Sequence, residues 1–187
     1  KVRSFAGNVM MRVEALKAVG GYREDVIAAE EDELCVRLRQ ANWQIWRVTS
    51  EMALHDAAML HFGQWWRRTC RAGYAFAQGS HLHGAPPERH FCREVYRALI
   101  WGCLLPTACI VTTVTLPSIG WIAWIIYPLQ LVRLTINNRG TPAARLRLSF
   151  FQLLARFPET LGLVMFWRDQ LLNRRPQIIE HKQVPES

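Results

Sequence analysis

The chain has 187 residues and a formal net charge of +8, and the charge is unevenly distributed. Asp, Glu, Lys and Arg are absent from residues 98–132, whereas basic residues outnumber acidic ones in residues 61–97 and 133–187. The basic balance raises nucleic-acid binding as an alternative, but the sequence contains no recognisable nucleic-acid motif, and we expect no nucleic-acid partner. Basic groups that flank an apolar block fit anionic membrane lipids better.

The cysteines argue against a disulfide framework and a zinc site. Their number is odd and no C-x-x-C pair occurs, which favours reduced thiols in a cytosolic compartment. The five are Cys35, Cys70, Cys92, Cys103 and Cys109.

The predicted elements of the first part alternate between strands and helices. The short helix ends at Gly20-Gly21, and the second helix places Leu34 and Leu38 on one face. A break at Gly84-Ala85-Pro86-Pro87 is the best domain boundary and separates residues 1–85 from 86–187. In chain order we expect a strand over 8–11, helices over 13–19 and 30–41, a strand over 43–48 and a helical pattern over 60–78.

The uncharged block at 98–132 predicts a helical hairpin. Thirty-five residues exceed the roughly 20 that one membrane-spanning helix needs and are just enough for two short spans. Turn residues at 115–120 divide the block, so we expect a hairpin over about 97–133. A re-entrant or tilted pair, or a buried hairpin of a soluble protein, is the alternative. Residues 143–173 have an interfacial rather than a spanning pattern.

Arginines on both sides of the hairpin predict its orientation. Arg93 and Arg97 precede it, and Arg133 and Arg139 follow it. Because Lys and Arg mark the cytoplasmic side of a membrane, we expect both flanks and the preceding domain to face the cytoplasm. For a bacterial cell this predicts the inner (cytoplasmic) membrane, with membrane lipids as partners.

Four acidic residues in a row, Glu30-Glu31-Asp32-Glu33, open the second predicted helix. Such crowding is unfavourable because like charges repel, and its usual use is to hold a proton acceptor or a metal ion. The alternative is a solvated first helical turn, where acids suit the helix dipole.

The order of five short motifs resembles the C-terminal half of a family 2 glycosyltransferase. Each motif is weak alone, but the five occur in the family's order within residues 1–55. They are Gly7-Asn8-Val9-Met10-Met11-Arg12, Ala18-Val19-Gly20-Gly21-Tyr22, the acidic row followed by Leu34-x-x-Arg37-Leu38, Asn42-Trp43-Gln44-Ile45, and His55.

The resemblance implies an α/β fold of the nucleotide-sugar-transferase (GT-A) type, followed by an α-helical membrane segment. It implies a nucleotide-sugar donor, inversion at the anomeric carbon, and a glycan or lipid-linked acceptor in cell-envelope or exopolysaccharide synthesis. It also implies a divalent metal, Mg²⁺ or Mn²⁺, bound largely by an upstream half. The nucleotide-binding half is expected before Lys1, so we expect residues 1–187 to be a fragment that does not turn over alone.

The family motif also assigns the catalytic base. Counting back six residues from Arg37 gives Glu31, preceded by Glu30, where the family has Glu-Asp. A shift of one residue gives Glu31-Asp32 instead, so Asp32 is the second candidate. A carboxylate at a helix start is a rigid platform for removing a proton from an acceptor hydroxyl.

Two further sets of residues are candidates by resemblance. His55 is a candidate metal ligand, or alternatively a strand-end histidine bonded to the backbone. Gln64, Trp65, Arg67 and Arg68 partly resemble the acceptor-side Gln-x-x-Arg-Trp motif of processive members. They also fit an amphipathic helix whose Trp and Arg rest at the bilayer surface. The alternative function for the whole chain is a non-catalytic membrane-anchoring or assembly module.

Overall fold

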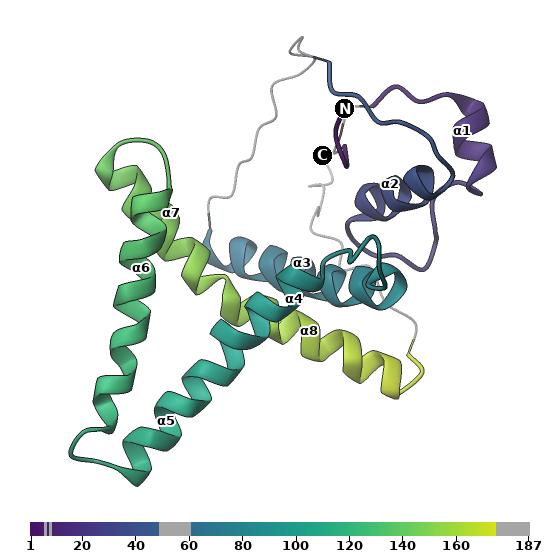
Figure 1. Cartoon of the computed structure of the whole chain (residues 1–187). Helices are drawn as coiled ribbons and strands as arrows, with labels where there is room; N and C mark the ends of the chain where they lie inside the picture. Colours follow the sequence, from purple (N-terminus) through teal and green to yellow (C-terminus); the bar gives the residue numbers. More distant parts are fainter. Residues whose placement is uncertain (6, 8, 49–60, 175–187) are drawn as a thin grey trace, which may run out of the picture. The chain divides into compact units, whose positions relative to one another are not determined.

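The computed structural model of the chain describes residues 1–5, 7, 9–48 and 61–174 (Figure 1). The chain divides into two compact units, one made of Lys1–Ala58 with Phe166–Ser187 and the other of Met59–Met165.

In the first unit, helices α1 (Val13–Ala18) and α2 (Glu30–Gln40) pack around a small apolar core. Their bounds confirm the two helices predicted here. Leu34 and Leu38 lie one turn apart on α2 and are buried with Ala15 of α1. The side chains that pack on this core are Phe5, Met11, Leu16, Val19 and Trp43.

The predicted α/β fold is wrong for the residues that the structure describes. Their regular structure is helical. Of the two segments expected as strands, 8–11 and 43–48, the described residues 9–11 and 43–48 form no sheet. An antiparallel bridge pairs Val2 with Ile45. β-Propensity depends on neighbouring strands, and a pair of strands is at best marginally stable alone. The apolar residues of these segments pack on helices instead: Met11 and Trp43 lie against the α1–α2 core.

The second unit is a set of helices joined by short connections (Figure 1). Its longest element, α3, extends beyond the predicted residue 78 because the first strong helix breakers are at residues 84–87. The elements are α3 (Phe62–His83), α4 (Cys92–Leu99), the π-helical turn η1 (Ile100–Leu104), α5 (Leu105–Thr115), the 3-10 helix η2 (Gly120–Ile125), α6 (Ile126–Asn137), α7 (Pro142–Leu154) and the part of α8 (Arg156–Leu171) up to Met165.

Small residues allow the helices of this unit to approach closely. A Cβ atom at Gly73 of α3 would collide with the backbone of Glu159, and one at Gly162 of α8 would collide with the backbone of Cys70. Gly102 of η1 likewise faces the carbonyl oxygen of Arg156. Such small residues at crossings are typical of helices that associate within a membrane.

The π-helical turn is held by a hydrogen bond from another helix. A π-type bond to the carbonyl of Trp101 would come from residue 106, which is a proline and has no N–H. The hydroxyl of Tyr127 on α6 donates to that carbonyl at 3.0 Å. The rings of Tyr127 and Trp101 also meet edge to face, so η1 and α6 are fixed to each other here.

Helices α5 and α6 form the two arms of a hairpin. A Cβ at Gly120 would collide with the backbone of Thr112, which shows how closely η2 approaches α5 at the tip. The indole of Trp124 donates to the Thr113 hydroxyl at 3.1 Å. From the tip the arms diverge toward the rest of the unit (Figure 1).

One helix in the described part of the chain is long and apolar enough to cross a membrane. It is the continuous run α4–η1–α5, Cys92–Thr115, which has 24 residues. At 1.5 Å per residue it is about 36 Å long, which exceeds the roughly 30 Å of a bilayer core. Only 11% of its most apolar window is buried inside the protein, unlike a core helix. Its length and composition therefore indicate membrane association.

Candidate functional site

The acidic row lies at the first turn of α2. The helix begins directly after Ala29, whose φ of 57° is in the left-handed region that non-glycine residues rarely adopt. Glu30, Glu31 and Asp32 are half-buried there. The partial positive charge of the helix N-terminus stabilises three neighbouring carboxylates at this place.

Glu33, the fourth acid, has a structural role. Its carboxylate is buried and accepts hydrogen bonds from Arg37, including Nη2 at 2.7 Å and Nε at 2.9 Å. The remaining Nη1 of Arg37 donates to the carbonyl oxygen of Val19 at 2.5 Å. The pair thus ties α2 to the turn that follows α1 and leaves Glu30, Glu31 and Asp32 as the acids available for chemistry.

Tyr22 lies beside the acidic row and was not selected from the sequence. Tyr22 is 46% exposed, so the burial of its hydroxyl is only partial; this partial burial raises the pKa of the hydroxyl, and the charges of Glu31, Cys35 and Glu30 raise that pKa further. The phenol therefore stays protonated next to the carboxylates, where it can donate a hydrogen bond. The signal was the aromatic residue after Gly20-Gly21, both of which have positive φ and turn the chain back toward α2.

The acidic row alone does not fit the divalent metal that the resemblance implies. Successive residues of an α-helix point about 100° apart, so Glu30, Glu31 and Asp32 cannot converge on one ion without rearrangement. Within the described residues no three His, Cys, Asp or Glu side chains form a metal-binding group. The predicted ligand His55 lies outside the described residues.

The second predicted set lies in the first two turns of α3, in the other unit. The side-chain oxygen of Gln64 accepts from the backbone N–H of His61 at 3.3 Å and caps the helix. Trp65 packs edge to face on Phe151 of α7, with ring centroids 5.2 Å apart. Gln64 thus has a capping contact and Trp65 a packing contact within this unit.

Arg67 and Arg68 of the same set are exposed on α3. Their guanidinium groups are accessible to an anionic substrate or an anionic membrane surface. The sequence motif therefore separates into one capping side chain, one packing side chain and two surface cations.

Comparisons of the chain with protein-family models, with curated proteins and with solved structures gave no match. Any assignment of function to this chain therefore rests on its own residues.

Proposed function

We propose that this chain is part of a membrane-bound inverting glycosyltransferase, which moves a sugar from a nucleotide-sugar donor to an acceptor hydroxyl. The acceptor is a glycan or a lipid-linked glycan of cell-envelope or exopolysaccharide synthesis. The observation that carries the proposal is the set of half-buried carboxylates at the start of α2, held in place by the buried Glu33–Arg37 pair. The proposal concerns the activity and does not require a sheet among the described residues.

Glu31 is the proposed general base, and Asp32 is the second candidate. The carboxylate takes the proton of the acceptor hydroxyl while that oxygen attacks the anomeric carbon, and the bond to the nucleoside diphosphate breaks on the opposite face. A base must be within hydrogen-bonding reach of its proton and must keep a fixed position. The helix start supplies the fixed position, because Arg37 bonds both Glu33 and the Val19 carbonyl.

The neutral phenol of Tyr22 supports this role. A hydroxyl group next to the base can orient either the carboxylate or the acceptor oxygen by donating one hydrogen bond. Burial and the charges of Glu31 and Glu30 keep its pKa above the ordinary value, so it does not add a negative charge to the site. Mg²⁺ or Mn²⁺, which the resemblance implies, is not assigned to residues of this chain.

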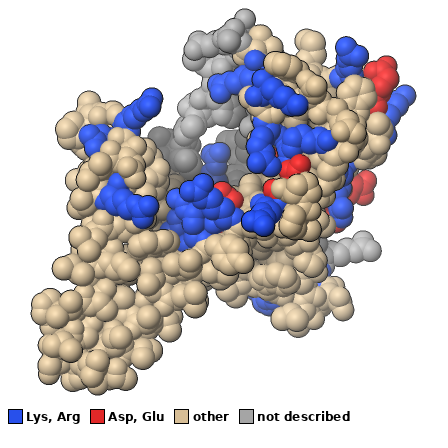
Figure 2. All heavy atoms as spheres, in the orientation of Figure 1, with Lys and Arg blue, Asp and Glu red and all other residues tan. Residues whose placement is uncertain are grey.

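The membrane part of the proposal is a hairpin with both ends in the cytoplasm, at the inner membrane. It is supported by the membrane-length helix Cys92–Thr115 and by the many exposed apolar side chains of α5 and α6. Figure 2 shows no charged residues on the lower part of the hairpin and a group of Lys and Arg at its other end. Helices α7 and α8 are proposed to lie at the cytoplasmic surface of the bilayer.

Cysteine labelling tests this orientation. In a chain without its native cysteines, His90→Cys and Gly140→Cys should both react with an impermeant maleimide from the cytoplasmic side only. Reaction from opposite sides would mean that the hairpin crosses the membrane once, and extraction of the protein by alkaline carbonate would mean that it does not cross at all.

Sugar transfer by the protein in membranes tests the site. Membranes with the full-length protein are incubated with a panel of radiolabelled nucleotide sugars, and label in the acceptor fraction is counted. Glu31→Gln should reduce transfer by roughly 10²–10⁴-fold, the usual contribution of general base catalysis. Glu30→Gln removes the same charge from the same turn and serves as the matched control, expected to remain within about tenfold of the wild type.

Two other outcomes identify the error. If Asp32→Asn abolishes transfer and Glu31→Gln does not, the motif is displaced by one residue. If both variants keep near-normal transfer, the acids are a solvated helix start and the alternative function, a membrane-anchoring or assembly module, is supported. That alternative is favoured by the capping and packing contacts of Gln64 and Trp65, which need no substrate.

A further inference from the structure

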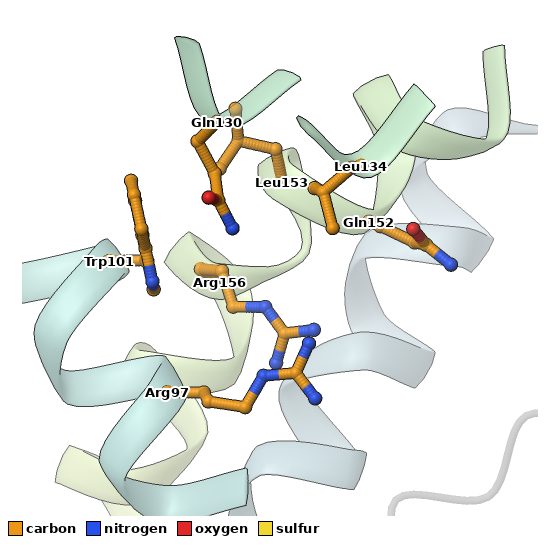
Figure 3. A pocket seen from close by; sticks show the side chains of 7 residues that line it. All are labelled: Arg97, Trp101, Gln130, Leu134, Gln152, Leu153 and Arg156. Atoms are coloured by element: carbon orange, nitrogen blue, oxygen red, sulfur yellow. The ribbon is translucent and has the colours of Figure 1, made fainter. Parts of the chain in front are cut away.

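A small pocket that opens to solvent lies in the second unit, between α4, the π-helical turn and helices α6, α7 and α8 (Figure 3). Its lining is unusual for an apolar helical unit because four of its seven side chains are hydrogen-bond donors of the Arg or Gln type. The lining residues are Arg97, Trp101, Gln130, Leu134, Gln152, Leu153 and Arg156.

Two arginines supply the positive charge of the pocket. The guanidinium groups of Arg97 and Arg156 lie beside each other (Figure 3). Burial lowers the pKa of Arg156, the charge of Glu159 opposes this shift, and the charge of Arg97 adds a smaller lowering. Arg156 pairs with the buried carboxylate of Glu159 at 2.7 Å. Glu94, which lies on the same helix as Arg97, also affects the pKa values of Arg156 and Glu159. Its effect is weaker than that of Arg97. Among the described residues that line the pocket, none carries a carboxylate.

The two glutamines make the pocket richer in donors than in acceptors. The side-chain oxygen of Gln152 already accepts from the Asn138 amide at 3.1 Å, which leaves its amide nitrogen as the group to be offered. The side chain of Gln130 points toward Arg156 (Figure 3). A ligand with several acceptor oxygens and a negative charge matches this arrangement, and a phosphate group has both properties.

The place of the pocket indicates what carries the phosphate. Arg97 and Trp101 lie near the beginning of the membrane-length helix Cys92–Thr115, and Arg and Trp are the residues that occupy the headgroup level of a bilayer. Beyond the pocket, Leu104 of η1 and Leu129 of α6 are exposed on the two apolar arms. A ligand with its phosphate in the pocket can therefore place acyl or prenyl chains along an apolar surface.

We propose that the pocket formed by Arg97, Arg156 and Gln130 binds the phosphate group of a membrane lipid. Arg97 and Arg156 pair with the phosphate oxygens, and the Gln130 amide, which points toward Arg156 (Figure 3), donates to one that remains. The proposal does not depend on the transferase activity and applies equally to a lipid that holds the hairpin in place and to a lipid-linked acceptor. If the pocket binds a lipid phosphate, polar contacts with the lipid as well as apolar burial hold the hairpin in the membrane.

The test measures binding of soluble short-chain lipids to the purified full chain in detergent by isothermal titration calorimetry. The probes are dioctanoyl phosphatidic acid, dioctanoyl phosphatidylglycerol, dioctanoylglycerol as the phosphate-free control, and inorganic phosphate as the lipid-free control. We expect both phospholipids to bind, dioctanoylglycerol not to bind, and inorganic phosphate to bind at least about tenfold more weakly, because it lacks the apolar contacts.

Arg97→Gln should weaken phospholipid binding by roughly 10–100-fold, the effect of losing hydrogen bonds to a charged group. Arg93→Gln is the matched control, because Arg93 lies one turn earlier on α4, is exposed and carries the same charge. It should change the affinity by less than about twofold, as is usual for an exposed charge outside a site. Circular dichroism checks the helix content of each variant. If Arg97→Gln does not fold, Arg97→Lys and Gln130→Leu take its place, and each should weaken binding about threefold or more.

Three results would overturn the proposal. Equal losses in Arg93→Gln and Arg97→Gln would mean that a diffuse positive surface attracts the lipid. Binding of inorganic phosphate as tight as that of the phospholipids would mean that the pocket takes a free phosphate. Binding of dioctanoylglycerol equal to that of phosphatidylglycerol would mean that the phosphate makes no contribution.

Discussion

Replacing Arg37 alone should lower the opening free energy of α2 far more than replacing both Arg37 and Glu33. Arg37→Leu leaves the Glu33 carboxylate, whose side chain is 3% exposed, without the guanidinium that accounts for its hydrogen bonds within α2. It also removes the hydrogen bond of 2.5 Å that Nη1 of Arg37 donates to the Val19 carbonyl oxygen. Breaking a buried pair in this way costs about 3–5 kcal/mol, whereas replacing both members by apolar residues is often neutral. The double variant Glu33→Leu/Arg37→Leu should therefore recover most of the loss.

Hydrogen exchange of α2 peptides, measured by mass spectrometry on the full chain, gives the opening free energy. At about 1.4 kcal/mol per tenfold change, the expected loss corresponds to exchange that is faster by roughly two to three and a half orders of magnitude in Arg37→Leu. The double variant should lie within about one order of magnitude of the wild type. An acceleration below about fivefold in Arg37→Leu would refute the reasoning, because it would mean that water solvates Glu33 and that the pair is worth little.

Three further predictions concern single positions. Ala29→Gly should stabilise the first turn of α2 by roughly 0.5–1 kcal/mol, because glycine adopts the φ of 57° without the penalty of a Cβ; slower exchange of the first α2 amides would show this, and unchanged exchange would contradict it. Gly102→Leu should lower the thermal unfolding midpoint of the chain in detergent, since its side chain would enter the space of the Arg156 carbonyl; an unchanged midpoint would mean that η1 and α8 separate without loss. Burial raises the pKa of Glu159 above its unfolded value of about 4.3. The folded state therefore binds this proton more tightly than the unfolded state does. The contribution of Glu159 to stability should then fall as pH rises through the folded pKa. The difference in midpoint between the wild type and Glu159→Gln, followed from pH 7.5 down to about 4.5, should shift in favour of the wild type, and a constant difference would contradict the assignment.

The helices could be predicted from the sequence because their signals are local. The predicted ends of α1 and α2 agree with the structure to within one residue, since Gly20-Gly21 stops one helix and the Leu34/Leu38 spacing identifies the other. The hydroxyl of Thr113 in α5 bonds back to the Cys109 carbonyl at 2.7 Å, which is likewise a local contact.

The errors came from features that depend on distant partners. Residues 43–48 have the composition of a strand, but a strand needs neighbours, and Trp43 packs on the α1–α2 core instead. The structural role of Glu33, which was not among the catalytic candidates, also depends on the contact of its partner Arg37 with Val19, 18 residues before Arg37 in the chain. The pocket residues Arg97, Gln130 and Arg156 are separated by 33 and 26 residues, and no sequence motif connects them.

The π-helical turn at Ile100–Leu104 lets the first arm of the hairpin hold one residue more than a regular α-helix would in the same length. Deleting Cys103, which is exposed, would let the turn relax to an α-helix and keep α5 in about the same orientation relative to α4. Relaxation of the turn without a deletion would instead rotate everything after it by about 100°, and the Tyr127 hydroxyl would no longer reach the Trp101 carbonyl. At this position, unlike in the regular part of the helix, a deletion should therefore be tolerated.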